Sequence, residues 1–412
     1  MLKACERMAL VAAAFAVAVT VGSAQDWNQW RGPSRTGVAI AFKPPASWPD
    51  RPTRVWEVPV GTGHASPVVA DGQTYMFSRV GAQEALTSYE LSTGKQLWRR
   101  SYDAPYKVNP AAAAHGEGPK STPALDRGRI YTFGIGGMLS AWRAKDGQLL
   151  WRRDFRKEFS RTSPDYGVAM SPLVLNDAVI VHAGGPGNGA LMALDAAKGS
   201  VRWAWTGDGP AYASPVVARF SGVPQVITQS QRHIVSVDVS NGRLLWQIPF
   251  TTDFDQNVVT PVVVDDLLIY SGNQRPLTAV RVVQQGGKWS TSAVWQNEAL
   301  PNYMSTPVVV GDTLYGLTQR SRGQFFAADV RSGKTLWTTR GREADNAALV
   351  TWGDLLIATT TEGELVVVRA GRKAFDVIRR YTVAESPVWA HPVPAGSGVL
   401  IKDEETLAYY TF

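Results

Sequence analysis

Apolar and polar positions in this chain alternate over short segments that recur along most of its length. Residues 66–100 illustrate one unit: an apolar run from Pro67 to Ala70, a turn at Asp71-Gly72, and three further segments rich in β-branched and aromatic residues. Such residues favour strands, and an Asp-Gly pair between them favours a hairpin. The unit therefore predicts four short antiparallel strands, which make up one propeller blade.

The opening of this unit, a small polar residue followed by proline and apolar residues, returns about every 46 residues. It includes Pro67, Pro123, Pro172, Pro215, Pro261 and Pro307, and it recurs in weaker form at Leu349 and Pro392. A unit of this size cannot bury its apolar face alone and must stack on its neighbours. The eight units predict an all-β fold, an eight-bladed β-propeller of four-stranded antiparallel blades.

A large aromatic residue closes most units, usually four positions after a glycine. These residues are Trp98, Trp151, Trp203, Trp246, Trp295, Trp337 and Phe375. A ring at this place can pack against the neighbouring blade and bury about 150–250 Å² of surface. We interpret these residues as inter-blade packing rather than as ligand contacts.

The two ends of the repeat region complement each other. The eighth unit has three predicted strands and lacks a tryptophan strand, whereas residues 54–59 read as a strand containing Trp56 with no opening strand before it. Pairing residues 54–59 with the last unit would close the ring and remove its open sheet edges. We therefore expect one propeller domain over residues 54–412, closed by its N-terminal strand.

Residues 1–24 differ from the repeats. Two basic residues precede an apolar stretch, residues 8–21, and small residues follow up to Ala24. This order is typical of a secretory signal, and the apolar stretch is too short to span a bilayer comfortably. We expect cleavage after Ala24 and a periplasmic or secreted protein that does not span the membrane, with residues 25–53 forming a strap over the ring.

Cysteine content and charge exclude several classes of function. Cys5 is the only cysteine and lies in the predicted signal, so the mature chain would have no disulfide, thiolate metal site or catalytic thiol. The formal net charge is +7, and the basic residues are spread over the repeats. We attribute this charge to solubility and do not expect a nucleic acid partner for an exported protein.

The repeat resembles that of the PQQ-like (pyrroloquinoline quinone repeat) β-propeller family. The resemblance rests on Ser66-Pro67-Val68-Val69 and Leu91-Ser92-Thr93-Gly94-Lys95-Gln96-Leu97-Trp98, and it covers nearly all of residues 54–412. The segment Trp27-Asn28-Gln29-Trp30-Arg31-Gly32-Pro33 is similar to the start of many exported bacterial members. The resemblance implies the propeller fold, but a fold by itself does not transfer an activity.

Two branches of this family imply different activities. Quinoprotein dehydrogenases hold the quinone beside calcium, between a Trp and a disulfide, with an Asp as base; the predicted mature chain has no cysteine for that disulfide. The other branch resembles the lipoprotein of the outer-membrane assembly machinery, which binds protein and carries no cofactor. The lipid-anchor cysteine of that lipoprotein is not found here.

Loops that enter the first strand of each blade gather at one face of a propeller. Residues shortly before the repeat prolines vary there within an otherwise constant frame, as a binding surface requires. The long connections 102–120 and 155–170 are expected to roof the same face. The candidate ligand-binding residues at this channel mouth are His64, Lys120, Tyr166, Tyr212, Asn257, Tyr303, Asn346, Trp389 and His391.

Metal binding is a weaker interpretation of two other groups. Asp253, Asp255 and Asn257 supply oxygen atoms at alternate positions, but no EF-hand pattern follows them. Histidines at 64, 115 and 391 include no closely spaced pair. We therefore expect no metal at either group.

We predict an exported, non-catalytic propeller that acts as a binding scaffold in the cell envelope and needs no cofactor. Its partner would be an envelope protein or an extracellular ligand, with carbohydrate as one option. The alternative is a PQQ-dependent dehydrogenase of alcohols or sugars with calcium and a reduced cofactor site, in which Lys120, Trp389 and a carboxylate of the channel would hold the quinone. No catalytic residue can be assigned from the sequence.

Overall fold

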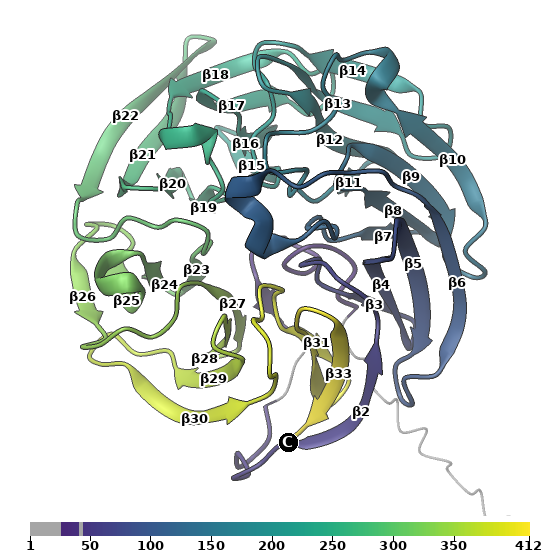
Figure 1. The fold of residues 1–412 in the computed structure, drawn as a ribbon. Helices are drawn as coiled ribbons and strands as arrows, with labels where there is room; N and C mark the ends of the chain where they lie inside the picture. The colour runs from purple at the N-terminus through teal and green to yellow at the C-terminus, as the bar shows by residue number, and fades with distance from the viewer. Residues whose placement is uncertain (1–25, 41–43) are drawn as a thin grey trace, which may run out of the picture.

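Eight antiparallel sheets surround a central channel in the computed structural model, which describes residues 26–40 and 44–412 (Figure 1). Successive sheets follow the chain around the ring, from purple through teal and green to yellow in Figure 1. This arrangement confirms the predicted eight-bladed propeller. The predicted signal segment, residues 1–24, lies outside the described residues. No helix among the described residues is both long and apolar enough to cross a bilayer.

The first four blades each contain four strands in chain order, with the innermost strand first. Blade 1 has β3 (Val68–Ala70), β4 (Gln73–Val80), β5 (Gln83–Glu90) and β6 (Gln96–Asp103). Blade 2 has β7 (Ala124–Asp126), β8 (Arg129–Phe133), β9 (Met138–Arg143) and β10 (Leu149–Asp154). Blade 3 has β11 (Leu173–Leu175), β12 (Ala178–Gly185), β13 (Asn188–Asp195) and β14 (Val201–Trp205). Blade 4 has β15 (Val216–Phe220), β16 (Val223–Gln229), β17 (His233–Asp238) and β18 (Leu244–Pro249).

The remaining blades follow the same order, and blades 7 and 8 each include a strand from the N-terminal part of the chain. Blade 5 has β19 (Val262–Val264), β20 (Leu267–Gly272), β21 (Arg275–Gln285) and β22 (Lys288–Asn297). Blade 6 has β23 (Val308–Val310), β24 (Thr313–Thr318), β25 (Gln324–Asp329) and β26 (Thr335–Thr338). Blade 7 has β27 (Ala347–Trp352), β28 (Leu355–Thr360), β29 (Glu364–Arg369) and β30 (Asp376–Thr382), joined by β1 (Val38–Ala39). Blade 8 has β31 (Val393–Ala395), β32 (Gly398–Lys402), β33 (Thr406–Thr411) and β2 (Thr53–Pro59).

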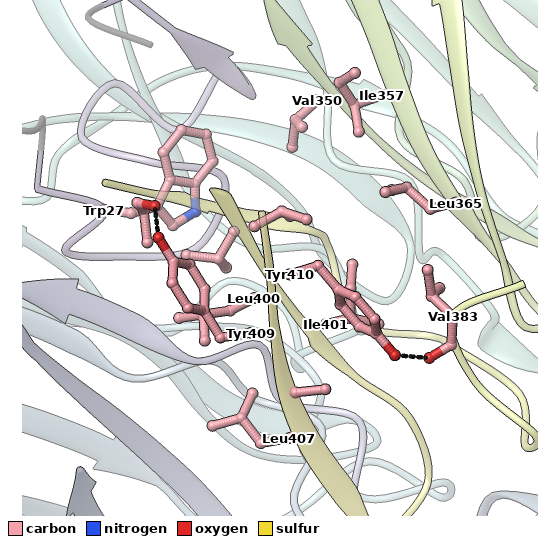
Figure 2. Close-up of a cluster of buried hydrophobic side chains, with 14 of the residues drawn as sticks. Trp27, Val350, Ile357, Leu365, Val383, Leu400, Ile401, Leu407, Tyr409 and Tyr410 are labelled. Carbon is pink, nitrogen blue, oxygen red and sulfur yellow. Dashed lines mark hydrogen bonds between the residues drawn. The ribbon is translucent and has the colours of Figure 1, made fainter. Parts of the chain in front are cut away.

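Blade 8 closes the ring as the sequence predicts. Strand β2 pairs antiparallel with β33, and Trp56 lies opposite Tyr409 in the register. Figure 2 shows the cluster behind this seam, where the Tyr410 hydroxyl donates a hydrogen bond of 2.8 Å to the carbonyl oxygen of Val383 in blade 7. The closing strand therefore replaces an open sheet edge with a packed seam.

Most outer-strand tryptophans dock on the next blade, which explains the recurring glycine. The Trp98 indole donates a hydrogen bond to the Ala144 carbonyl at 3.1 Å, and a Cβ placed on Gly147 would lie 2.6 Å from the Trp98 ring. The same docking joins Trp56 to Leu91 and Trp203 to Val239. Glycine is required at this turn because the ring covers it and because its φ is positive, 70° at Gly147.

Blade 4 departs from this pattern. The Trp246 indole donates to the Gln225 side chain of its own blade at 2.8 Å instead of reaching blade 5. The hairpin of β21 and β22 is longer than the others, and Trp289 near its tip packs in the cluster that contains Trp246 and Phe220. In the other blades with an outer-strand tryptophan, a short turn of the next blade meets that ring. Here the extended β21–β22 hairpin packs beside Trp246 instead.

Hydroxyl groups two residues before the innermost strands link neighbouring blades around the channel. The Ser66 amide donates to the Thr122 hydroxyl at 3.0 Å, and the Thr122 amide donates to the Ser171 hydroxyl at 3.0 Å. The same bond recurs from Ser171 to Ser214, from Ser214 to Thr260, from Thr260 to Thr306, and from His391 to Ser66. These side chains therefore act between blades.

Residues 26–40 close the channel at the end opposite the entry loops. The Trp27 amide and carbonyl bond to Val69 at 2.9 and 3.0 Å. The Asn28 carbonyl accepts from the Leu125 amide at 2.7 Å, and the Asn28 side-chain amide donates to the Leu125 carbonyl at 3.0 Å. Both partners follow the repeat proline, toward the far end of the innermost strand. Trp27, 1% exposed, packs into the cluster drawn in Figure 2. We call this segment the strap.

Candidate functional site

A cavity of about 220 Å³, open at its mouth, lies where the entry loops of the blades converge. We call it the mouth cavity, and the face that carries it the mouth face. Its lining comes from the entry loops of all eight blades, from η1 (Pro110–His115) in the connection between blades 1 and 2, and from the strap. Figure 1 shows η1 as the dark-blue helical turn over the centre of the ring. Three shorter 3-10 helices, η2 (Phe155–Lys157), η3 (Asp253–Asp255) and η4 (Arg320–Arg322), lie in other loops.

Eight of the nine candidate residues line this cavity together. They are His64, Lys120, Tyr166, Tyr212, Tyr303, Asn346, Trp389 and His391. Asn257 does not line it. Its side chain is fully buried and donates to the backbone carbonyls of Ser230 and Gln231 at 2.8 and 3.1 Å, so its role is to hold the loop in place.

Aromatic rings form much of the cavity wall. The rings of His115 and Trp389 lie 4.7 Å apart in a T-shaped arrangement, and the His64 ring is 5.6 Å from His115. On the other side, the Tyr166 and Tyr212 rings are 5.9 Å apart. Edge-on contacts of this kind hold the rings in fixed orientations. The wall therefore offers apolar faces at defined angles.

The histidines of the wall are neutral near pH 7. Burial lowers the pKa of His64 to about 3 and that of His391 to about 3, and it also lowers the pKa of His115. Desolvation disfavours the charged imidazolium, which explains all three shifts. The Nε2 atoms of His64 and His391 are buried and have no hydrogen-bond partner among the described residues. The cavity wall thus contains polar atoms whose hydrogen bonds are unused.

Lys120 is the single Lys, Arg, Asp or Glu among the described residues that line the cavity. Its Nζ donates to the Tyr166 carbonyl oxygen at 2.8 Å, a contact that joins the entry loop of blade 2 to that of blade 3. Burial lowers the pKa of Lys120 to about 8. No carboxylate balances this cation within the lining.

Two functional positions escaped sequence reasoning as cavity residues. Trp30 of the strap forms part of the lining, and its ring is 5.6 Å from that of His391. The guanidinium carbons of Arg31 and Arg35 each lie 5.3 Å from the Trp30 ring centre and hold it in place. His115 was considered as a possible metal ligand in a connection expected to roof this face, but not as a ligand-binding residue of the cavity. The entry-loop alignment could not place Trp30, because the strap lies outside the repeat.

Arg31 and Arg35 anchor the strap to opposite sides of the channel. Arg31 donates to the Pro307 carbonyl at 2.6 Å, and Arg35 donates to the Pro172 carbonyl at 2.8 Å. Both arginines are 3% exposed, and burial lowers the pKa of each to about 9. Two buried guanidinium groups that bond to backbone carbonyls fix the floor of the cavity.

The residues present do not fit a quinone held by calcium. Calcium takes six to eight oxygen ligands, typically with carboxylates among them, and the quinone chemistry needs a carboxylate base. None of the described residues that line the cavity is Asp or Glu. No group of three metal-ligating side chains occurs elsewhere in the described part of the chain either. We derive no reaction step through such a cofactor.

These features define a class of protein: an eight-bladed propeller of the PQQ-repeat type whose channel is closed at one end and opens at the other into an aromatic cavity. The family described as outer membrane protein assembly factor BamB matches residues 83–339. The match covers more than half of the chain, and the chain therefore belongs to this family. The predicted resemblance to PQQ-like propellers is confirmed.

The relatives favour the assembly factors. The protein from Yersinia pestis named outer membrane protein assembly factor BamB is 25% identical over 382 residues, which cover 87% of this chain and 88% of the relative. The quinohemoprotein alcohol dehydrogenase ADH-IIG of Pseudomonas putida is 28% identical over 142 residues, only 34% of this chain and 19% of that enzyme. The comparisons thus support the predicted non-catalytic scaffold over the predicted dehydrogenase.

Solved structures agree on the fold. BamB from Moraxella catarrhalis gives a TM-score of 0.62 at 16% identity and covers 88% of this chain and 98% of its own. The quinohemoprotein alcohol dehydrogenase from Comamonas testosteroni gives 0.66 at 13% identity, with coverage of 93% and 80%. At these identities the likeness establishes the propeller and does not choose between the two activities.

Proposed function

We propose that this chain is an exported, non-catalytic propeller that binds another envelope protein during assembly of the outer membrane. Family membership supports the compartment and the scaffold role. The mouth cavity agrees with it, because its lining offers surfaces for binding but no acid and base for a reaction. A carbohydrate ligand has no support from the comparisons.

Phe254 is the observation that supports a partner surface on the mouth face. This side chain is 75% exposed, and its φ is 59°, in the left-handed region that large side chains avoid. It lies in η3, two residues before Gln256, which lines the cavity. An exposed aromatic side chain on a strained backbone costs free energy in the isolated chain. Contact with a partner would offset that cost.

The loop around Phe254 is well supported despite its strain. The Asp255 carboxylate accepts a hydrogen bond of 2.7 Å from Gln231, and Gln231 in turn accepts one from the Gly187 amide at 2.7 Å. Gln256 accepts a bond of 2.7 Å from the Tyr303 hydroxyl. These bonds present Phe254 from a fixed position, as a protein-binding anchor requires.

The proposed location and chain division follow the same reasoning. We place the mature protein in the periplasm, after cleavage of a signal over residues 1–24 behind Ala24. Residues 25–53, which include the strap, then precede the propeller over residues 54–412. N-terminal sequencing of the exported protein tests this division. A mature protein that begins at Gln25 would agree with it, and one that retains residues 1–24 would refute it.

Site-specific photocrosslinking tests the partner surface. A photoreactive amino acid is placed at position 254 in the chain expressed in its own bacterium, and crosslinked proteins are identified by mass spectrometry. We expect adducts with proteins of the outer membrane assembly machinery. Position 354 is the control, because Asp354 lies on a hairpin of the opposite face and its side chain is 68% exposed. Equal adducts from the two positions, or none from position 254, would argue against the proposal.

A separate assay tests the absence of catalysis. The purified protein is incubated with PQQ and calcium, and reduction of a dye is followed with alcohols and sugars as substrates. We expect no turnover above that of the free quinone. Saturable turnover that depends on the protein would instead support the dehydrogenase.

A further inference from the structure

The mouth cavity has features of a ligand site that protein binding at Phe254 does not use. Its volume is about 220 Å³, which is a little below the range of about 300–1,000 Å³ for cavities that hold drug-sized molecules and suits a smaller ligand. Its wall combines aromatic rings, two buried imidazole nitrogens without partners, and one cation. Each of these features restricts the chemistry of a molecule that could enter.

The cation favours an anionic ligand. Lys120 Nζ donates one hydrogen bond of 2.8 Å, to the Tyr166 carbonyl oxygen, and an ammonium group has three N–H donors. The lining supplies no carboxylate to balance the charge. A buried charge without a counter-charge is costly, and a ligand carboxylate would relieve that cost.

The number of cations favours a single negative charge. Arg31 and Arg35 lie behind the Trp30 ring, and their guanidinium groups bond to backbone carbonyls of the channel. The wall histidines are neutral because burial lowers their pKa values, to about 3 for His64. A ligand with two or three carboxylates would leave uncompensated charge in the cavity.

The wall favours a flat ring beside that carboxylate. Trp389 and His115 present ring faces and edges on one side, and Tyr166 and Tyr212 do so on the other. Stacked or edge-on contacts with such rings contribute about 0.5–1.5 kcal/mol each beyond the burial of their area. Aliphatic chains gain only the burial.

The strap closes the inner end of the cavity. Trp30 lines its floor, and the strap backbone bonds to Val69 and Leu125 beneath it. A polypeptide could not thread through the channel, so only a small molecule or the end of a chain fits. Entry is further narrowed by η1, whose residues Ala111, Ala112 and His115 form part of the lining.

We propose that the mouth cavity binds a small aromatic monocarboxylate, with its carboxylate on Lys120 and its ring between the aromatic walls. This inference goes beyond the proposed function, because it does not depend on the partner protein. The unpartnered Nε2 atoms of His64 and His391 lie in the same wall, where a polar ligand atom or a water that accompanies the ligand can bond to them.

Calorimetry with a matched pair of probes tests this site. Naphthalene-2-carboxylate carries the ring and the charge, and naphthalene-2-carboxamide carries the ring alone. We expect the carboxylate to bind the full mature chain about 10–100-fold more tightly, the range for a hydrogen bond to a charged group. Equal affinity for the two probes, or no binding of the carboxylate at millimolar concentration, would overturn the proposal.

Substitutions of Lys120 test whether this side chain causes the preference for the carboxylate. Lys120→Met should remove the preference for the carboxylate and leave carboxamide binding unchanged, whereas Lys120→Arg should retain the preference. Lys107→Met is the matched control, since Lys107 is exposed on the same loop and does not line the cavity. If Lys120→Met fails to fold, the arginine variant and the pH series below still decide. A preference that persists in a folded Lys120→Met would refute the role of Lys120.

Two further arms define the ligand. The preference for the carboxylate should weaken as pH rises above about 8, since the Lys120 amine then loses its charge; a preference that is constant from pH 7 to 10 would contradict the proposal. A short peptide ending in naphthylalanine, as its free acid and its amide, distinguishes a chain end from a free small molecule. Tighter binding of the peptide acid than of naphthalene-2-carboxylate would assign the site to chain ends and overturn the small-molecule source, whereas weaker binding would support it.

Discussion

Lys402 illustrates how single residues support the ring. The side chain is fully buried on β32 in blade 8, and its Nζ donates to the carbonyl oxygens of Gly63, Asp403 and Glu404 at 3.2, 2.5 and 2.9 Å. The bond to Gly63 joins blade 8 to the loop that enters blade 1. Three carbonyl groups satisfy the three N–H donors, which makes a buried ammonium tolerable.

We predict that Lys402→Met destabilises the protein by about 1–3 kcal/mol at pH 7, since buried carbonyls lose their donor. Burial lowers the pKa of Lys402 from 10.5 to about 8. Between these values the unfolded chain holds a proton that the folded chain has lost, so wild-type stability should rise with pH relative to the variant. Urea unfolding at pH 7 and pH 10 measures this. A difference between the two proteins that is the same at both pH values would be inconsistent with the assignment.

Position relative to the repeat proline predicted where most candidate residues lie, and Asn257 shows the limit of that argument. Neighbouring residues of an extended segment point in opposite directions. Val258 lines the cavity, whereas Asn257 turns into the wall and bonds to backbone carbonyls. The alignment fixes the height of a residue along the channel but not the direction of its side chain. The alignment could not place Trp30 at all, because the strap lies outside the repeat.

Tryptophan docking is the device that joins successive blades at the level of elements. The sequence predicted that the outer rings pack between blades. The structure adds that a glycine lies directly beneath the ring at five docking turns, whereas a Cβ on Gly371, to which Trp337 bonds, would not touch that ring. The sequence did not predict the exception at Trp246. The length of the β21–β22 hairpin does not by itself reveal that this hairpin packs against blade 4. Local repetition predicts the common unit and fails where one unit has an insertion.

We predict that Gly147→Ala destabilises the protein more than Gly128→Ala, although both lie in blade 2. Their φ angles are nearly equal, 70° and 73°, so the backbone strain introduced by alanine is the same. A Cβ at Gly147 would lie 2.6 Å from the Trp98 ring, whereas a Cβ at Gly128 would meet nothing within 4 Å. Overpacking costs about 1–3 kcal/mol beyond that shared strain. Equal thermal unfolding of the two variants would show that docking contributes little.

The whole molecule depends on one noncovalent seam, that between β2 and β33. The other blades have all of their outer strands from the same chain segment, whereas blade 8 takes β2 from a position nearly 350 residues away in sequence. The complementary ends of the repeat predicted this pairing correctly. The path of residues 26–40 across the end of the channel could not be predicted, because these residues contain no repeat to align.

We predict that Trp56→Ala opens this seam. Trp56 is 8% exposed, donates to the Leu91 carbonyl at 2.8 Å and packs on Gly94 of blade 1. The loss should be about 3–5 kcal/mol. Hydrogen exchange should accelerate most in β31, β32 and β33, because these strands lose their edge partner.

Trp295→Ala is the matched comparison for that variant. Trp295 docks in the same way, with a hydrogen bond of 2.8 Å to the Val330 carbonyl and a ring against Gly333, but between blades joined by continuous chain. Its exchange should accelerate locally in blades 5 and 6. Faster exchange in blade 8 for both variants would indicate that the seam is no weaker than the rest of the ring.

Quantitative mass spectrometry of the outer membrane is the most direct measurement of the proposed role. Four strains of the native bacterium are compared: the wild type, a strain without the gene, one with Phe254→Ala, and one with Asp354→Ala on the opposite face. We predict less outer membrane protein in the strain without the gene, a smaller decrease with Phe254→Ala, and no change with Asp354→Ala. Unchanged outer membrane proteins in the strain without the gene would contradict a role in their assembly.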